Sequence, residues 1–255
     1  MYLSELVEGL LGGEDWAIAR AITLVENDAP EIQNILAMTE SEGRPAQRIG
    51  ITGAMASGKS TLIAALLAEW LKEGRSVGVI AVDPTSRKSG GAFLGDRLRM
   101  IEHYRNPLFF CRSMATRGNT QGLVERLDAM MEIMRLGGKE LVVVETIGAS
   151  QDAIDIRRFV DTLVMVLLPT GDLITYQKAG LLEVADIVVM NYGDFPGANL
   201  SMVALRSALA LRQDAGSREI PVIKTIAKDG VGVTELKDAI REHGEDIMRV
   251  GRESA

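Results

Sequence analysis

The sequence has one cysteine, few aromatic residues and no excess of positive charge. Cys111 is alone among 255 residues, so no internal disulfide can form, and we expect a reducing, cytoplasmic compartment. Aromatic residues make up 4% of a chain that is 47% hydrophobic, so the core must be aliphatic, with methionine as filler. The net charge of −7 argues against a nucleic-acid partner, because such a partner needs a basic surface.

The sequence also lacks a long apolar segment. No uninterrupted apolar run is long enough to cross a lipid bilayer, and no basic segment precedes an apolar one near the first residue. We therefore expect neither a membrane span nor a targeting segment. The length suits one large α/β domain with an appendage.

The most informative motif is a glycine-rich loop at residues 53–60 that fits the P-loop pattern G-x-x-x-x-G-K-[ST]. A strand is predicted before it at 48–52, and a helix rich in Ala and Leu follows at 59–73. This context distinguishes a P-loop from a glycine-rich turn with an incidental lysine. The residues expected to bind nucleotide here are Gly53, Ala54, Met55, Ala56, Ser57, Gly58, Lys59, Ser60 and Thr61.

The residue types in this loop suit phosphate chemistry. Gly53 and Gly58 let the backbone turn its N–H groups toward phosphates at the positive end of the helix dipole. Lys59 supplies a cation near the β- and γ-phosphates and is a predicted catalytic residue. The Ser60 hydroxyl is a predicted Mg²⁺ ligand.

Strands alternate with helices from residue 48 onward, and several strands are continuous aliphatic runs, which is typical of a parallel sheet covered on both faces. Strands are predicted at 48–52, 76–82, 108–112, 140–145, 162–168, 187–191 and 222–225. Helices are predicted at 59–73, 120–136, 152–159, 174–184, 199–213 and 233–249, followed by a polar tail that we expect to fray.

A helical prefix precedes this pattern. Leu3, Leu6 and Leu10 recur at helical spacing, a second helix follows Gly12-Gly13, and a third is predicted at 30–39. We therefore expect an N-terminal helical extension at 1–45 and a nucleotide-binding domain at 46–250. The apolar stripes of the extension are expected to pack on the domain, and contact with a partner is the alternative.

Acidic residues lie at or after the ends of two predicted strands. Asp83 and Asp96 lie on a glycine-rich segment after the second strand, where ligands bind in open α/β sheets, so they are candidate Mg²⁺ ligands. Glu145 ends an aliphatic strand as in a Walker B motif, with Gly148 placed to approach the γ-phosphate. Gln151 is a candidate for orienting the attacking water, and a solvated helix start is its alternative. The predicted catalytic set is Lys59, Glu145, Gln151 and Asp96.

Four arginines are further candidates for stabilising charge in a transition state, although surface or structural roles are commoner for such residues. They are Arg97, Arg99, Arg112 and Arg117.

A base-recognition segment is expected after the strand at 187–191. Asn191-Tyr192-Gly193-Asp194 is similar to the Asn-Lys-x-Asp sequence of GTPases, with Tyr192 in the lysine position. The Asp194 carboxylate can accept from guanine N1–H and N2–H, and the Tyr192 ring can stack on a base. Ala227 follows the last strand, where a backbone N–H can meet guanine O6. A strand end followed by a Gly-Asp turn is the alternative.

Longer segments resemble the MeaB/ArgK/MMAA family over residues 3 to 245. They are Ala-Arg-Ala-Ile-Thr-Leu-Val-Glu at 19–26, Asp-Pro-Thr-Ser at 83–86, Gly-Gly-Ala-Phe-Leu-Gly-Asp-Arg-Leu-Arg-Met at 90–100, Ser-Met-Ala-Thr-Arg-Gly at 113–118, Val-Glu-Thr-Ile-Gly at 144–148, and Lys-Ala-Gly-Leu-Leu-Glu-Val-Ala-Asp-Ile at 178–187. The segment around Gly95-Asp96-Arg97 is far more specific than the P-loop.

The resemblance implies a Mg²⁺-dependent GTPase of the SIMIBI class that binds GTP and GDP. It implies a chaperone role for an adenosylcobalamin-dependent acyl-CoA mutase, such as methylmalonyl-CoA mutase, in cofactor loading, protection or reactivation. It further implies Mg²⁺ ligation by Ser60, Asp83, Asp96 and Glu145, guanine recognition by Asn191 and Asp194, and a switch segment at 171–180.

The sequence departs from the family pattern at several positions. Tyr192 replaces the usual lysine, residues 120–122, 149–153 and 174–175 differ, and the long C-terminal arm by which members dimerise is not seen. We therefore expect a divergent member, and any homodimer to use another interface. The alternatives kept open are a small-molecule kinase, a nickel-insertion GTPase of the same branch, and a scaffold in which nucleotide only holds a shape.

Overall fold

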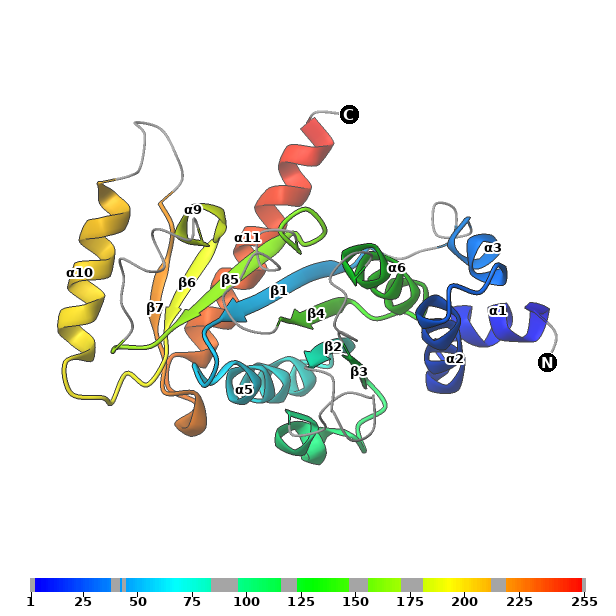
Figure 1. Cartoon of the computed structure of the whole chain (residues 1–255), viewed down its shortest axis with the longest axis horizontal. Helices are drawn as coiled ribbons and strands as arrows, with labels where there is room; N and C mark the ends of the chain where they lie inside the picture. Colours follow the sequence, from blue (N-terminus) through cyan, green and yellow to red (C-terminus); the bar gives the residue numbers. More distant parts are fainter. Residues whose placement is uncertain are drawn as a thin grey trace. The chain divides into compact units, whose positions relative to one another are not determined.

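A computed structural model gives the structure of the protein and describes residues 3–37, 42, 45–83, 96–115, 123–146, 156–170, 181–211 and 219–253 (Figure 1). The strands are β1 (Gln47–Gly53), β2 (Val77–Asp83), β3 (Phe109–Ala115), β4 (Leu141–Glu145), β5 (Thr162–Leu167), β6 (Ile187–Met190) and β7 (Val222–Lys224). They form a seven-stranded sheet in the order β3-β2-β4-β1-β5-β6-β7. The β1–β5, β2–β3, β5–β6 and β6–β7 pairs are parallel. The predicted α/β class with a parallel sheet flanked by helices is confirmed.

Most helices also lie close to their predicted places, but the helices predicted at 152–159 and 174–184 fall mostly outside the described residues. The described helices are α1 (Leu3–Leu11), α2 (Asp15–Glu26), α3 (Glu31–Ala37), α5 (Lys59–Lys72), α6 (Leu123–Leu136), α9 (Leu181–Val184), α10 (Ala198–Ala210) and α11 (Val233–Glu253). Two 3₁₀ helices, η1 (Asp96–His103) and η2 (Ala227–Asp229), were not predicted. The prediction that the chain frays after Arg249 is wrong, because α11 continues to Glu253.

By its contacts the chain separates into two compact units. The first unit contains residues 1–48 and 70–144, and the second contains residues 49–69 and 145–255. The P-loop, Glu145 and the base-recognition segment all belong to the second unit. The proposed boundary between an extension at 1–45 and a domain at 46–250 stays a prediction.

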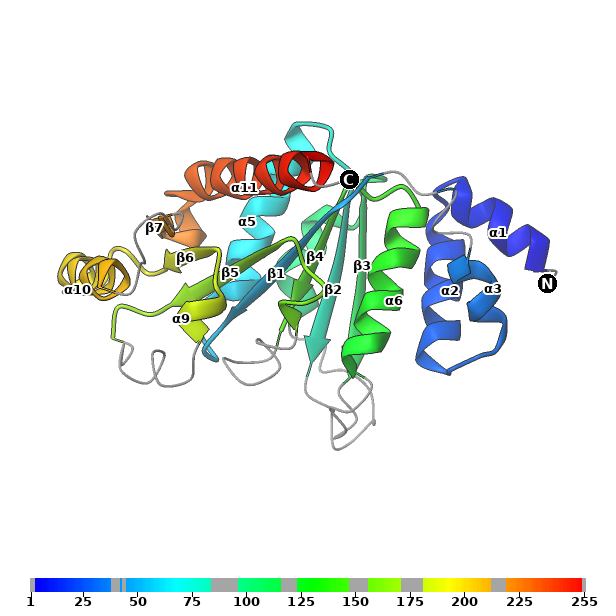
Figure 2. The ribbon, with the colours of Figure 1, turned by 90° about the horizontal axis from the view of Figure 1, so that it is seen from above.

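In the first unit, the helical prefix packs beside α6 (Figure 2). Leu6 and Leu10 of the predicted stripe are buried, as are Ile18 and Ile22 of α2, whereas Leu3 is 38% exposed. Polar contacts add to this packing, since Lys139 Nζ lies 3.5 Å from Asp15 Oδ1. The apolar face of the prefix is therefore used within this unit.

In the second unit, one apolar cluster joins β5, β6, α9 and α10. Its members are Met165, Leu167, Leu182, Ala185, Val188, Met190, Met202, Leu205 and Leu209. Ala54 of the P-loop packs against this cluster, and this packing fixes the start of the loop. In Figure 2, α11 lies on one side of β5 and β6, and α9 lies on the other.

A polar contact network ties α11 to β5. His243, 8% exposed, shares a 2.9 Å hydrogen bond between its Nδ1 and Thr162 Oγ1. Its Nε2 lies 3.4 Å from Asp186 Oδ1, which also accepts from Arg157 Nη2 at 3.1 Å. The other Asp186 oxygen accepts from the Leu163 N–H at 2.8 Å. The Asp186 carboxylate thus contacts both a backbone N–H at the start of β5 and the His243 ring of α11.

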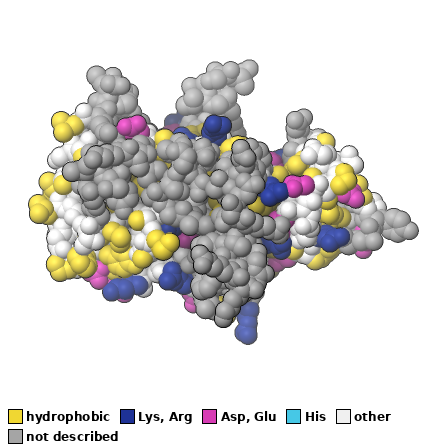
Figure 3. All heavy atoms as spheres, viewed as in Figure 1, with side chains coloured by type: hydrophobic (Ala, Val, Ile, Leu, Met, Phe, Trp, Pro, Cys, Tyr) yellow, Lys and Arg dark blue, Asp and Glu magenta, His cyan; other side chains and the backbone are white. Residues whose placement is uncertain are grey.

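The outer face of α10 and the residue after it carry several apolar side chains. Leu200, Val203 and Leu211 are exposed, and Figure 3 shows hydrophobic side chains at the surface on the side where α10 lies. The opposite face of α10 carries Met202, Leu205 and Leu209 into the cluster described above.

Candidate nucleotide-binding site

The glycine-rich loop joins β1 to α5 and turns at two positions where only glycine fits. Gly53 has φ +149°, and a Cβ there would lie 2.2 Å from the Val166 carbonyl oxygen. Gly58 has φ +85°, and a Cβ there would lie 2.3 Å from Asn191 Nδ2. These close approaches bring the loop against β5 and against the segment after β6. The predicted strand–loop–helix context is confirmed.

Lys59 lies at the first position of α5 and folds back over the loop. Its Nζ donates to the carbonyl oxygens of Gly53 at 3.0 Å and Ala54 at 3.1 Å. The side chain is 8% exposed, so the ammonium group is held inside the loop rather than in solvent. A cation in this place has the position and charge to meet phosphate oxygens.

Ser60 and Glu145 meet next to the loop. The Ser60 hydroxyl donates to Glu145 Oε1 at 2.8 Å, and both residues are 4% exposed. The Thr146 N–H donates to the Ile51 carbonyl at 3.1 Å, which holds the residue after Glu145 beside Ile51 within the second unit. A hydroxyl and a carboxylate are hard oxygen donors of the kind Mg²⁺ prefers, so this pair fits the ion.

Two buried hydroxyls near this pair point to a polar ligand. Among the described residues, Ser57 Oγ and Thr146 Oγ1 are buried without a hydrogen-bond partner. A buried polar atom left in this way costs about 1–3 kcal/mol. Phosphate oxygens, or water around a metal ion, are groups that can satisfy such hydroxyls.

The Asn191 side chain connects three parts of the second unit. Its Nδ2 donates to the Ser57 carbonyl at 2.9 Å, while its Oδ1 accepts from Thr225 Oγ1 at 3.1 Å and from the Ala227 N–H at 3.2 Å. The residue is 2% exposed. One hydrogen of its amide group is not used by these contacts and is chemically suited to a guanine N7 acceptor.

Asp194 and Lys228 face each other at the exposed side of the base-recognition segment. Asp194 Oδ2 lies 3.1 Å from Lys228 Nζ, with the two side chains 45% and 62% exposed. The hydrogen bond from Lys228 lowers the pKa of the Asp194 carboxyl, and that carboxylate raises the pKa of Lys228. Asp194 is therefore kept ionised, as a residue must be that accepts from two guanine N–H groups.

The structure brings together one part of the predicted site and leaves another part undescribed. Glu145 contacts Ser60 of the P-loop, and Asn191 contacts both Ser57 of the P-loop and Ala227. Gly148, Gln151 and the segment 171–180 lie outside the described residues. Asp83 ends β2 and Asp96 begins η1, but their side chains lie outside the described part.

The structure describes the side chains of two of the four candidate arginines. Arg112 forms an ion pair with Glu26 and its Nη2 lies 3.3 Å from Thr23 Oγ1, so it joins β3 to the helical prefix in the first unit. Arg99 is exposed at η1. Arg97 and Arg117 lie outside the described side chains.

Thr146, Thr225 and Lys228 were not predicted as site residues. Thr225 follows β7 directly, Lys228 follows Ala227, and Thr146 follows Glu145 directly after β4. Each is a polar residue within two positions of a predicted site residue at the carboxyl end of a parallel strand. That position was the signal that could have found them.

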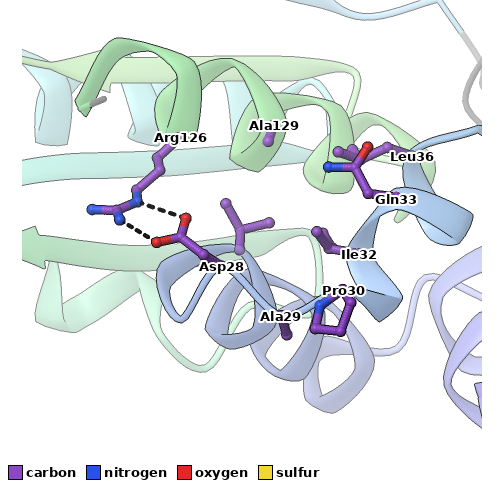
Figure 4. Close-up of a pocket in the computed structure, with 9 residues that line it drawn as sticks. Asp28, Ala29, Pro30, Ile32, Gln33, Leu36, Arg126 and Ala129 are labelled. Carbon is purple, nitrogen blue, oxygen red and sulfur yellow. Dashed lines mark hydrogen bonds and ion pairs between the residues drawn. The ribbon is translucent and has the colours of Figure 1, made fainter. Parts of the chain in front are cut away.

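A separate pocket lies in the first unit between α2, α3 and α6 (Figure 4). Its volume is about 370 Å³, and an Arg126–Asp28 ion pair forms one end. None of its nine lining residues belongs to the predicted nucleotide site.

Comparison with known proteins identifies the family. A family model described as methylmalonyl-CoA mutase-associated GTPase MeaB matches residues 18–255. The chain belongs to the MeaB family. This assignment confirms the resemblance in the sequence, and it makes the chain a P-loop GTPase by family and fold.

Individual MeaB-like proteins match along nearly the whole chain. A protein of Pyrococcus abyssi described as a GTPase is 43% identical over 255 residues, covering 98% of this chain and 78% of its own. The mouse protein described as methylmalonic aciduria type A homolog, mitochondrial, is 30% identical, covering 100% of this chain and 66% of its own. The solved structure described as LAO/AO transport system kinase superposes with a TM-score of 0.79 at 27% identity, covering 98% of this chain and 77% of its own.

The described residues of this MeaB-family chain contain no helix long and apolar enough to cross a lipid bilayer. They also contain no cluster of three or more His, Cys, Asp and Glu side chains suited to hold a metal ion.

Proposed function

We propose that the chain is a Mg²⁺-dependent GTPase that assists an adenosylcobalamin-dependent acyl-CoA mutase in loading, protecting or reactivating its cofactor. The observation that carries this proposal is the match of residues 18–255 to a family described as associated with methylmalonyl-CoA mutase. The 30% identity to the mouse methylmalonic aciduria type A homolog supports it.

Nucleotide would bind between the P-loop and the segment after β6. The Asp194 carboxylate would accept from guanine N1–H and N2–H, and the Ala227 N–H, now donating to Asn191, would meet guanine O6. The N–H groups of residues 54–60 would surround the phosphates. An adenine offers no donor pair to Asp194, so guanine selectivity would follow.

Hydrolysis would be an in-line attack of water on the γ-phosphorus, with cleavage of the bond to the β–γ bridging oxygen. Lys59 would leave the Gly53 and Ala54 carbonyls and place its ammonium group on phosphate oxygens, where charge increases in the transition state. Ser60 and Glu145 would hold Mg²⁺, which neutralises charge on the β- and γ-phosphate oxygens when bound. Asp83, Asp96, Gly148 and Gln151 stay predictions as further metal, phosphate and water contacts.

The test is steady-state GTP hydrolysis in Mg²⁺ with and without purified methylmalonyl-CoA mutase. We expect slow hydrolysis that increases when the mutase is present, and no hydrolysis by Lys59→Ala in either condition. An unchanged rate with methylmalonyl-CoA mutase and with other acyl-CoA mutases would overturn the chaperone proposal. An unchanged rate in Lys59→Ala would overturn the site.

A small-molecule kinase is the second candidate, because the solved structure with 27% identity is described as a transport system kinase. A kinase transfers the γ-phosphoryl group to an acceptor other than water. GTP labelled at the γ-phosphate distinguishes the two: free inorganic phosphate supports a GTPase, and a labelled organic product supports a kinase.

A further inference from the structure

Tyr192 has an unusual conformation at the centre of the candidate site. Its φ is +55°, in the left-handed region that bulky side chains rarely adopt. From this backbone its hydroxyl donates to the Ala56 carbonyl oxygen at 3.2 Å. Ala56 has φ +62°, so two non-glycine residues in the left-handed region meet at one hydrogen bond.

The neighbouring side chain makes the same kind of contact one residue further along the loop. Asn191 Nδ2 donates to the Ser57 carbonyl at 2.9 Å, so two consecutive side chains hold two consecutive P-loop carbonyls. Gly58 leaves room for both, since a Cβ there would lie 2.3 Å from Asn191 Nδ2 and 3.4 Å from Tyr192 Oη.

These contacts fix the directions of the loop amides. In a planar trans peptide, a carbonyl and the following N–H point in opposite directions. Holding the Ala56 carbonyl on one side therefore aims the Ser57 N–H to the other side, where it donates to the Ala54 carbonyl at 3.2 Å. Holding the Ser57 carbonyl orients the Gly58 N–H in the same way. The Gly58 amide is among those that the phosphates would use, and the Ser57 amide closes the loop on Ala54.

We propose that Tyr192 is a positioning residue that ties the guanine-recognition segment to the P-loop through its hydroxyl. The inference rests on the proposed binding of a guanine nucleotide. Asp194 lies two residues further along the same segment. A base bound to Asp194 therefore restricts the motion of this segment and holds the Tyr192 hydroxyl on the Ala56 carbonyl. Base recognition and phosphate recognition are coupled through the Tyr192 hydroxyl, which carries no charge, in the position where GTPases usually have a lysine.

The test compares a ligand with phosphates and one without. GDP with Mg²⁺ and guanosine are each titrated calorimetrically into wild-type protein and Tyr192→Phe. Loss of one neutral hydrogen bond should weaken GDP about fivefold, which is about 1 kcal/mol. Guanosine affinity should change by less than about twofold, because the ring and Asp194 are retained.

Two variants whose new side chains are similar in length test whether a hydrogen-bond donor at position 192 is needed. Tyr192→Lys supplies an N–H donor for the Ala56 carbonyl and should keep GDP affinity within about twofold of wild type. Tyr192→Met supplies no donor and should lose affinity at least as much as Tyr192→Phe. Tyr104→Phe, which changes a tyrosine that packs edge-on to Phe109 in the first unit, is the matched control and should bind GDP as wild type does.

The outcomes separate the inference from the function on which it rests. Wild-type protein that binds no guanine nucleotide overturns the proposed function. Wild-type binding with an unchanged GDP affinity in Tyr192→Phe overturns only the role of Tyr192. Equal losses of GDP and guanosine affinity in Tyr192→Phe also overturn the role of Tyr192. Such a result would show that the variant changes the binding of the base or the folding of the protein, and not the binding of the phosphates.

Discussion

Replacing Gly58 by alanine is expected to disrupt the P-loop through one identifiable collision. The new Cβ would lie 2.3 Å from Asn191 Nδ2, well inside contact distance, so the Asn191 amide has to move. Moving it breaks the 2.9 Å bond to the Ser57 carbonyl and leaves a buried amide unsatisfied. We expect this loss to cost about 1–3 kcal/mol. Alanine at φ +85° adds about 1 kcal/mol of backbone strain.

Gly197→Ala is the matched control within the same unit. Gly197 has φ +89°, but a Cβ there meets nothing within 4 Å. It should therefore cost only the backbone strain of about 1 kcal/mol, or about 2–4 °C in melting temperature. The excess loss in Gly58→Ala measures the collision with Asn191.

The assays are thermal unfolding by circular dichroism and GDP titration in Mg²⁺. Gly58→Ala should melt about 5–15 °C below wild type and should bind GDP weakly or not at all. Gly197→Ala should bind GDP as wild type does. Equal melting temperatures for the two variants would refute the reasoning, because the contact between residues 58 and 191 would then have no energetic weight.

Four further predictions concern charged residues. Asp194→Ala should lose about tenfold or more of its guanine preference, measured as the ratio of GDP to ADP affinity. Lys228→Met removes the partner that lowers the pKa of Asp194, so GDP affinity should fall at a higher pH than in wild type during acid titration. Burial lowers the pKa of Lys139, and the nearby Asp15 carboxylate offsets this only in part. The folded protein therefore releases the Lys139 proton at a lower pH than the unfolded protein does. Wild-type stability should then rise with pH above neutral relative to Lys139→Met, in urea unfolding at pH 7 and pH 9.5; a constant difference would contradict the assignment. Glu145→Gln keeps an acceptor for Ser60 but removes the charge, so the Mg²⁺ concentration for half-maximal hydrolysis should rise about tenfold; no rise would exclude Glu145 as a metal residue.

Much of the fold follows from local sequence. The aliphatic runs that become β4 and β5 are buried along their whole length, and continuous runs of this kind predict central parallel strands. The P-loop was recognisable because its glycines, lysine and serine occur at fixed spacing. Boundaries were less certain: α10 ends at Ala210 rather than 213, and α11 continues to Glu253. Helix ends depend on tertiary contacts that local propensity does not contain.

The contacts within the site were not predictable in the same way. Tyr192 Oη and the Ala56 carbonyl are 136 residues apart in sequence, and Asn191 Nδ2 and the Ser57 carbonyl are 134 apart. The sequence suggested that Tyr192 could stack on a base, and it gave no sign of its contact with the P-loop. Lys228 was missed because a lysine in a loop most often forms a solvated surface charge.

Calorimetric titration of wild-type protein with GDP, GTP, ADP and ATP in Mg²⁺ tests the central claim most directly. If the P-loop and the Asn191–Asp194 segment form one guanine-nucleotide site, both guanine nucleotides will bind at least about tenfold more tightly than their adenine counterparts. Equal affinities, or tighter adenine binding, would contradict that claim and the GTPase mechanism built on it.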